Sequence, residues 1–406
     1  MSDYLVFVLL FVAVAAGWFL GRGGRVLTMS SLWQSSDTLP SQYYRGLNFL
    51  LDGSQDGAID AFTKALEVNS ETFDTHIALG NVLRRRGEVE RAIRIHQNLL
   101  ARPSLPTSQL HLAHLELARD YISAGLLDRA ERLLLDLVAE SGHHQRIARR
   151  HLLEIYEAQS DWSAAKRVAG EILPRRSLLR SNGPDPNEVG QPIPLLLAHY
   201  CCEQAAIALH SGDLTEARTQ LDQALKYDRS CTRATLMSGE LELKAGNPAR
   251  AVKTLQLLKE QAPDFVSESA DLLRQALIQL NHRSALRSYL MDCYVAKAST
   301  PLLIALAEEI RAVEGSEQAK DFLRKHLVDK PSLGGLALLM ALHGTNEAGE
   351  DEPLQIEIVN RLVEANSTYQ CNHCGFRGQH LHWYCPGCKH WGTVRDLGAI
   401  GDVTHE

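Results

Sequence analysis

Four cysteines near the end of the chain have the spacing of a metal site. They form two pairs, Cys371-x2-Cys374 and Cys385-x2-Cys388, with ten residues between the pairs. Each pair lets one tight turn offer two thiolates to an ion, and two such turns complete a tetrahedron. The spacing therefore predicts that all four cysteines bind one metal ion. Zinc and iron both accept this ligand set, so both remain open.

The segment that holds these cysteines, residues 368–397, is too short to bury a stabilising apolar core without help. Bound structural zinc can supply on the order of 10 kcal/mol. We expect two short hairpins, each with one thiolate turn, around four aromatic side chains: Phe376, Trp383, Tyr384 and Trp391. Tyr369 and Leu381 are further candidates for this cluster. Four thiolates leave no open position for a substrate, so the metal is predicted to be structural. The nearby histidines are predicted to be neighbours rather than ligands: His373, His380, His382 and His390.

No other part of the chain carries a recognisable catalytic motif. We find no G-x-S-x-G, H-E-x-x-H, phosphate-loop or dinucleotide-binding pattern. The sequence therefore predicts a protein that is not an enzyme. A redox protein with a rubredoxin-type iron is the enzymatic alternative, although no flavin or nicotinamide motif accompanies it. The remaining cysteines are expected to be small apolar core residues in a reducing compartment: Cys201, Cys202, Cys231 and Cys293.

A repeat of about 34 residues runs through the middle of the chain. One alanine recurs with spacings of 34, 38, 35, 52, 34, 34 and 34 residues, at Ala58, Ala92, Ala130, Ala165, Ala217, Ala251, Ala285 and Ala319. A glycine, alanine or leucine precedes each by twelve residues, and in most repeats a larger residue follows four positions later. This is the tetratricopeptide (TPR) pattern, in which small residues let two antiparallel helices approach closely. It predicts a mainly α-helical superhelix of eight repeats.

Turn residues and irregular spacings predict the domain boundaries. Gly87, Gly125, Gly212 and Gly246 are expected to end the first helix of their repeats. The spacing of 52 reflects an insertion containing SNGPDPN, which predicts a loop or hinge that divides the array. The predicted order is repeats 1–4 over 39–173, a Pro/Gly/Asn loop over 174–197, repeats 5–8 over 198–333, a terminal helical segment over 334–367, the metal-binding domain over 368–397 and a tail over 398–406.

The beginning of the chain predicts a membrane anchor. Residues 4–20 carry no charge, and seventeen helical residues extend about 25 Å, near the minimum for a bilayer span. An acid, Asp3, precedes the run, and Arg22 and Arg25 follow it. A cleaved signal peptide would have basic residues first. Positive charge after the span favours an uncleaved anchor over 1–21, a juxtamembrane linker over 22–38, and the bulk of the chain on the cytoplasmic side.

A TPR array offers a concave groove, lined by the first helix of each repeat, which predicts a protein-binding function. Most groove-facing positions are basic, although the chain has a net charge of −7. They indicate an acidic protein segment or an anionic lipid surface as the partner, and an ordinary solvated surface is the alternative. Nucleic acid is excluded because the chain is acidic and has no basic stripe interleaved with aromatic residues. The candidate partner-binding residues are Asn81, Arg84, Arg85, Arg119, Arg233, Lys244, Arg274 and Arg311.

Several longer stretches resemble one protein family. Residues 45–62, 79–97 and 119–131, together with the ending YQCNHCGF…WYCPGCKHW, are similar to the lipopolysaccharide assembly protein B family of Gram-negative bacteria. The resemblance implies a single-pass inner-membrane protein with a cytoplasmic TPR array and a rubredoxin-like or zinc-ribbon domain, in which the four cysteines bind the metal.

The same resemblance implies a function and partners. Members of the family restrain lipopolysaccharide synthesis by promoting proteolysis of the deacetylase that commits precursor to lipid A. A membrane-bound AAA+ metalloprotease degrades that enzyme, and inner-membrane proteins that sense or export lipopolysaccharide are further implied partners. The alternative is a scaffold that coordinates lipopolysaccharide synthesis with export and does not control proteolysis.

Overall fold

The computed structural model describes residues 41–68, 72–102, 105–140, 142–173, 190–343, 357, 359–363 and 368–397. The chain divides into two compact units between Leu137 and Val138. The predicted anchor over 1–21, the linker over 22–38 and the tail over 398–406 lie outside the described residues. Within the described ranges, no helix has both the length and the apolar character needed to cross a membrane.

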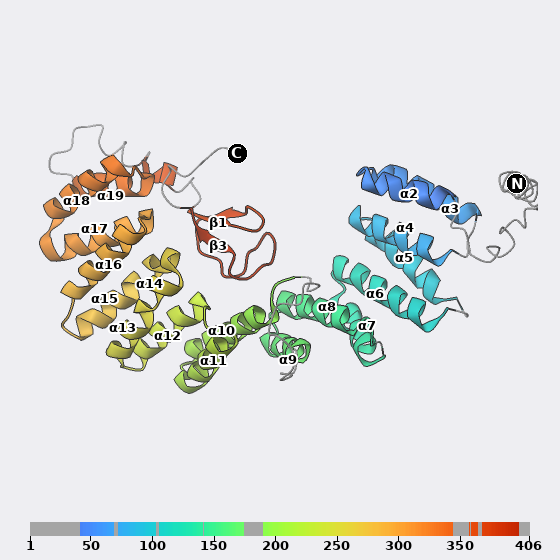
Figure 1. The fold of residues 1–406 in the computed structure, drawn as a ribbon, viewed down its shortest axis with the longest axis horizontal. Helices are drawn as coiled ribbons and strands as arrows, with labels where there is room; N and C mark the ends of the chain where they lie inside the picture. Colours follow the sequence, from blue (N-terminus) through green and yellow to red (C-terminus); the bar gives the residue numbers. More distant parts are fainter. Residues whose placement is uncertain are drawn as a thin grey trace, which may run out of the picture. The chain divides into compact units, whose positions relative to one another are not determined.

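The first unit is a stack of helical hairpins. From residue 41 to residue 123, consecutive helices pack on one another in chain order (Figure 1), as the TPR pattern predicts. The helices are α2 (Ser41–Leu51), α3 (Gln55–Val68), α4 (Phe73–Arg85), α5 (Val89–Leu100), α6 (Thr107–Ser123) and α7 (Leu127–Glu140), the last of which reaches into the second unit.

The second unit continues the hairpin pattern and ends in the metal-binding domain. Its helices are α8 (Gln145–Ala158), α9 (Trp162–Ile172), α10 (Ile193–Ser211), α11 (Leu214–Tyr227), α12 (Thr232–Lys244), α13 (Pro248–Gln256), α14 (Leu258–Gln261), α15 (Ala270–Gln279), α16 (Ser284–Ala296), α17 (Thr300–Glu314), α18 (Ser316–Asp329) and α19 (Leu333–His343). Two short 3-10 helices, η2 (Pro263–Phe265) and η3 (Ser267–Ser269), lie between α14 and α15. They therefore interrupt the regular alternation of helices in the sixth repeat.

The small residues of the repeat lie where two helices touch. Seven of the eight aligned alanines have no exposed surface. A Cβ added to Gly80 would lie 2.4 Å from Nε2 of His96, and one added to Gly239 would lie 2.4 Å from Cδ2 of Leu255. No real Cβ approaches so closely, so these helix pairs need glycine at the contact. The predicted close approach of the two helices is confirmed.

Residues with left-handed backbone in the turn of a repeat determine where its second helix begins, and therefore which of its residues face the core. Gly87, Gly125, Gly212 and Gly246 have φ between 73° and 87°, as expected for glycines that end a helix. Including Gly53 before Ala58, a left-handed glycine stands five positions before the buried alanine in five repeats. The turn therefore fixes which residues of the second helix face the core.

The seventh repeat departs from the predicted register. Ala285 is exposed, while Leu286 and Leu290 are completely buried. Here the left-handed residue is Asn281, with φ of 58°, and five positions after it comes Leu286. The turn lies one residue later than a strict 34-residue spacing assumes, so the placement of Ala285 in the core was wrong.

The insertion over 174–197 does not divide the stack. On its two sides, α9 and α10 pack directly on each other. The ammonium of Lys166 on α9 donates to the side-chain oxygens of Gln204, at 3.3 Å, and of Gln220 and Gln223, both at 2.7 Å. The repeats on the two sides of the predicted loop are therefore in direct contact, and the loop ends earlier than expected because α10 already begins at Ile193. Residues 174–189 lie outside the described part.

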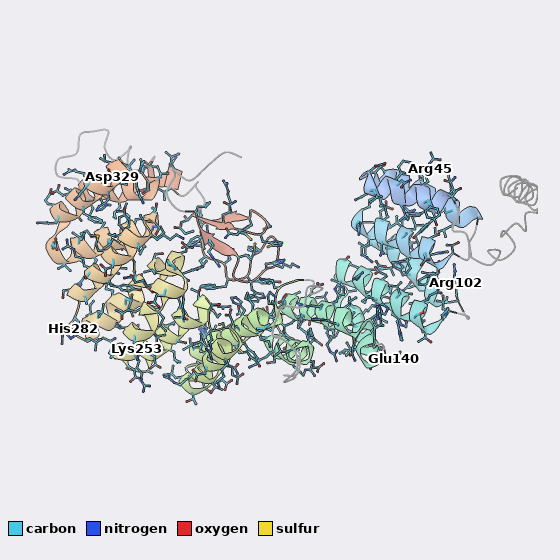
Figure 2. The ribbon with its side chains drawn as sticks, viewed as in Figure 1. Arg45, Arg102, Glu140, Lys253, His282 and Asp329 are labelled. Atoms are coloured by element: carbon cyan, nitrogen blue, oxygen red, sulfur yellow. The ribbon has the colours of Figure 1, made fainter. Side chains whose placement is uncertain are left out.

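The metal-binding domain is built on a three-stranded antiparallel sheet. Strands β1 (Tyr369–Cys371), β2 (Arg377–Gly378) and β3 (Val394–Asp396) have the order β2-β1-β3. Tyr369 lies opposite Gly378 in one pair and Asp396 in the other. The sheet lies on the inner side of the arc formed by α10–α19 within this unit (Figure 1), whereas Lys253 and His282 lie on its outer side (Figure 2).

Candidate metal centre and repeat groove

The four predicted cysteines come together at one point. Their Sγ atoms all lie within 4.8 Å of one another, and Cys371–Cys388 and Cys374–Cys385 are separated by 3.7 Å. A tetrahedron with metal–sulfur bonds of about 2.3 Å has edges of about 3.8 Å, whereas a disulfide bond is about 2.05 Å long. The geometry therefore fits one ion held by four thiolates and does not fit two disulfides.

The two cysteine turns share one backbone conformation. The N–H of Gly375 donates to the carbonyl of Cys371, and the N–H of Lys389 donates to the carbonyl of Cys385, each at 2.9 Å. Both donors have left-handed φ, 76° for Gly375 and 56° for Lys389. The protein thus shapes both turns through its own hydrogen bonds, which suits a structural metal site.

Two of the predicted neighbouring histidines stack beside the cluster. The rings of His373 and His390 lie 3.9 Å apart at 20°, and a nitrogen of each lies within 4.8 Å of Cys388 Sγ. Nδ1 of His390 lies 2.8 Å from the Cys388 carbonyl oxygen. The four cysteines already form a closed set, so these rings flank the site.

A tryptophan just beyond the last cysteine joins this domain to the repeats. The side chain of Trp391 is 1% exposed. Its ring stacks on His199 with centroids 5.0 Å apart and meets Trp162 edge-on at 5.7 Å. The indole N–H donates to Oε1 of Glu157 at 3.0 Å. Trp391 is therefore a core residue of the array, although it belongs to another domain.

Hydrogen bonds fix the position of this tryptophan. The Gln191 side chain donates to the Trp391 carbonyl at 2.8 Å and accepts from the Trp391 N–H at 2.7 Å. Tyr200 donates to the same Glu157 oxygen at 2.6 Å. Backbone groups that would lose water on docking are thus satisfied by one side chain.

Burial sets the charge of the groups around Trp391. It lowers the pKa of His199 to about 3, with Arg233 and Arg395 adding to the effect, so the ring that stacks on Trp391 is neutral at pH 7. Burial also raises the pKa of Glu157, and this outweighs the hydrogen bonds from Tyr200 and Trp391. Burial thus disfavours the charged form of both groups at this contact.

A second contact lies at the two 3-10 helices. Trp383 stacks on Phe265 with centroids 5.3 Å apart, and the Arg395 guanidinium lies 4.7 Å from the same phenyl ring. The hydroxyl of Tyr369 donates to Glu268 at 2.6 Å. The irregular segment after α14 thus positions Phe265 and Glu268 for the metal-binding domain.

The aromatic cluster differs from the sequence-based expectation. Around the thiolates the domain packs Tyr369, Phe376 and Leu381, together with Val394. Trp383 and Trp391 were expected in this cluster, but they pack on the repeats instead, because so small a sheet cannot cover two indoles. The sequence did contain a signal for this packing, because the thirty residues of the domain carry more aromatic surface than so small a fold can bury. Sequence reasoning missed the receiving residues, which lie on separate repeats: Glu157, Trp162, Gln191, His199, Tyr200, Phe265 and Glu268.

The predicted basic groove is largely neutralised by acidic neighbours. Arg84 pairs with Asp120 at 2.7 Å and with Glu116 at 2.8 Å. The prediction of a basic lining did not account for acids on the same helix or on adjacent helices. The other paired residues are Arg119 with Glu116 at 2.6 Å, Arg233 with Glu203 at 2.7 Å, Lys244 with Glu240 at 2.8 Å and Arg274 with Glu309 at 3.1 Å.

Three of the candidate groove residues lie outside these ion pairs. Asn81 and Arg85, both on α4, line one cavity with residues of α2. Arg311 is exposed on α17. Partner binding at all eight candidate positions stays a prediction.

A TPR array that carries a small four-cysteine domain defines the class of this protein. Residues 208–275 match a tetratricopeptide repeat model, and residues 369–396 match a rubredoxin metal binding domain model. Among solved structures, the C-terminal part of a TPR repeat-containing protein from Cytophaga hutchinsonii aligns with 69% of this chain and 99% of its own, at 10% identity and a TM-score of 0.41.

Similarity over the full length identifies the family. Lipopolysaccharide assembly protein B of Escherichia coli K12 is 35% identical over 98% of this chain and 98% of its own. The protein of the same name from Haemophilus influenzae is 30% identical over 97% of this chain and 98% of its own. The chain belongs to the lipopolysaccharide assembly protein B family, as the sequence stretches and the cysteine ending predicted.

Proposed function

We propose that this protein is a membrane-anchored adaptor in lipopolysaccharide assembly. Residues 1–21 hold it in the inner membrane with the repeats on the cytoplasmic side. The adaptor promotes proteolysis of the deacetylase that commits precursor to lipid A, by a membrane-bound AAA+ metalloprotease. Anchoring restricts the repeats to the membrane surface, which raises their effective concentration near such a protease.

The observation that carries the proposal is that Trp391 of the metal-binding domain is buried in the repeats. The chain also belongs to the lipopolysaccharide assembly protein B family. An array of helical hairpins provides surfaces for protein partners and no single enclosed pocket. The metal-binding domain occupies part of the inner side of that array and spans from α8 to η3 through Glu157 and Glu268. It therefore holds several repeats in one geometry, and we assign the metal, iron or zinc, a structural role in maintaining that surface.

The proposal is tested by two variants in cells that lack the native chain. Cys371→Ser/Cys374→Ser removes two thiolates, and Trp391→Ala keeps all four but removes the contact with the repeats. At equal protein level, both are expected to lengthen the half-life of the deacetylase, while the exposed His380→Ala should leave it unchanged. Normal turnover with both variants would exclude a required role for the docked domain.

A scaffold for lipopolysaccharide synthesis and export is the second candidate. It is favoured by the same extended array, which can hold several partners at once. A scaffold predicts co-purification with export proteins and a normal deacetylase half-life when the chain is depleted. An adaptor for proteolysis predicts a longer half-life.

A further inference from the structure

A cavity in the first unit lies between the first helices of two consecutive repeats. It has a volume of about 270 Å³ and is formed by α2 and α4. Leu50, Ile77 and Val82 give it an apolar floor. Asp74 and Arg85, both exposed, stand at opposite ends of the stretch of α4 that lines it. The cavity is therefore apolar in the middle and oppositely charged at its two ends.

A buried ion network orients one hydrogen-bond donor toward this cavity. Arg84 donates to Oδ1 of Asn81 at 2.7 Å, and because a guanidinium can only donate, the amide oxygen must face it. The Asn81 NH2 group is left to face other partners. Arg84 itself is held by Glu116 and by Asp120, a residue with no exposed surface.

The same network extends into the core. Oδ2 of Asp120 lies 2.6 Å from Nδ1 of the fully buried His96. Arg84 is thus a positioning residue that cannot turn toward a ligand without breaking buried ion pairs. Among the α4 residues that line the cavity, Asn81 and Arg85 carry the side-chain N–H donors for a bound segment.

We propose that the cavity binds an extended protein segment with an acidic side chain at the Arg85 end, a basic side chain at the Asp74 end and an apolar side chain between them. Eleven residues of helix separate Asp74 from Arg85, a rise of about 16 Å. An extended chain covers that distance in about five residues. The inference rests on the proposed adaptor function, for which it supplies the sequence character of a client or protease segment.

The test uses the purified full-length chain in detergent micelles and a defined peptide, acetyl-Lys-Ala-Leu-Ala-Glu-amide. Saturation-transfer NMR detects binding with dissociation constants up to about 10 mM. The wild-type protein is expected to bind this peptide, and Arg85→Glu to weaken binding at least about tenfold. The matched control is Lys253→Glu, which reverses an exposed charge on α13 and should bind as the wild type does.

A compensating peptide distinguishes lost recognition from lost folding. Acetyl-Lys-Ala-Leu-Ala-Lys-amide should bind Arg85→Glu better than it binds the wild type. Equal binding of both peptides to both proteins, or no saturation transfer at about 10 mM, would overturn the proposal. This assay needs no protease, so it tests the cavity separately from the adaptor function. Absent peptide binding together with a longer deacetylase half-life on depletion would reject the cavity as a binding site and retain the proposed adaptor.

Discussion

At the scale of single residues, Trp391 makes the main contact between the metal-binding domain and the helices around α8 and α10. An indole buried against another domain contributes its whole apolar surface to the contact between them. Its N–H has an acceptor in Glu157, and its backbone is paired with Gln191. The polar groups of Trp391 therefore keep hydrogen-bond partners when docking removes them from water.

Truncating Trp391 should separate the metal-binding domain from the repeats without releasing its metal ion. Trp391→Ala is expected to remove roughly 3 to 5 kcal/mol of contact energy, because it leaves a cavity and takes one of two hydrogen-bond donors, the indole N–H, away from Glu157, which keeps the Tyr200 hydroxyl. Hydrogen exchange should rise in α8 and α10 while the metal content stays at one ion per chain. His380→Ala is the control from the same domain. Unchanged exchange in Trp391→Ala would show that other contacts hold the domain.

Docking should also weaken as pH falls. The pKa of His199 is about 3 in the folded protein, below the usual value of about 6.5 for an unfolded chain. The unfolded state therefore takes up a proton first, and the contribution of His199 is lost as pH falls below about 6.5, by up to roughly 1.4 kcal/mol per pH unit. The raised pKa of Glu157 acts in the opposite direction.

The pH effect can be measured by hydrogen exchange of the docked domain between about pH 7 and 5.5, after correction for the intrinsic exchange rate. Metal content should be recorded at each point, so that loss of the ion is recognised. His199→Phe keeps a ring at this position and should reduce the pH dependence. A wild type and a variant with the same pH profile would contradict the assignment to His199.

At the scale of elements, the two helices of a repeat approach so closely at a glycine that no space is left for a methyl group. A Cβ on Gly239 would lie 2.4 Å from Leu255, whereas one on Gly170, also helical, would meet no atom within 4 Å. Gly239→Ala is expected to destabilise the protein by about 1 to 3 kcal/mol. The same change at Gly170 should be neutral or stabilising by up to about 1 kcal/mol. Thermal unfolding compares the two, and equal midpoints would contradict this account of the repeat.

The repeat and its turns could be predicted because they depend on local chemistry. A glycine between two helical segments, such as Gly87 or Gly246, indicates a turn from the local sequence alone. Small residues at a fixed spacing likewise indicate where two helices touch. The phase error at Ala285 arose because Asn281 can also adopt left-handed backbone, so a turn can move by one residue without a glycine. Such a shift is hard to detect from spacing alone.

The cysteine site was predictable for the same local reason, while the docking site was not. Each thiolate pair is contained in four consecutive residues. In contrast, Glu157 and Trp391 are 234 residues apart, and Arg84 and Glu116 belong to different repeats. Which groups meet at such distances depends on how the repeats stack, which composition and spacing do not encode directly.

At the scale of the whole molecule, metal removal is expected to disrupt the docking of the small domain on the repeats and to leave the helix content largely unchanged. Removing it with a chelator under reducing conditions should unfold the small domain, whose buried core contains Cys371 and Cys385. The helical hairpins have their own buried cores and should keep most of their far-UV signal.

Intrinsic fluorescence checks this expectation, because three of the five tryptophans lie at or beside the docking contact: Trp162, Trp383 and Trp391. Their emission should shift to longer wavelength when the ion is removed and return when it is restored. Complete loss of metal with unchanged emission would show that the domain stays docked without it.

The most direct measurement of the central claim is the half-life of the lipid A-committing deacetylase in cells depleted of this chain, with the wild-type chain restored in a parallel culture. The adaptor account predicts a clearly longer half-life on depletion, a rise in lipopolysaccharide, and normal turnover after restoration. An unchanged half-life in depleted cells would contradict it and favour the assembly scaffold.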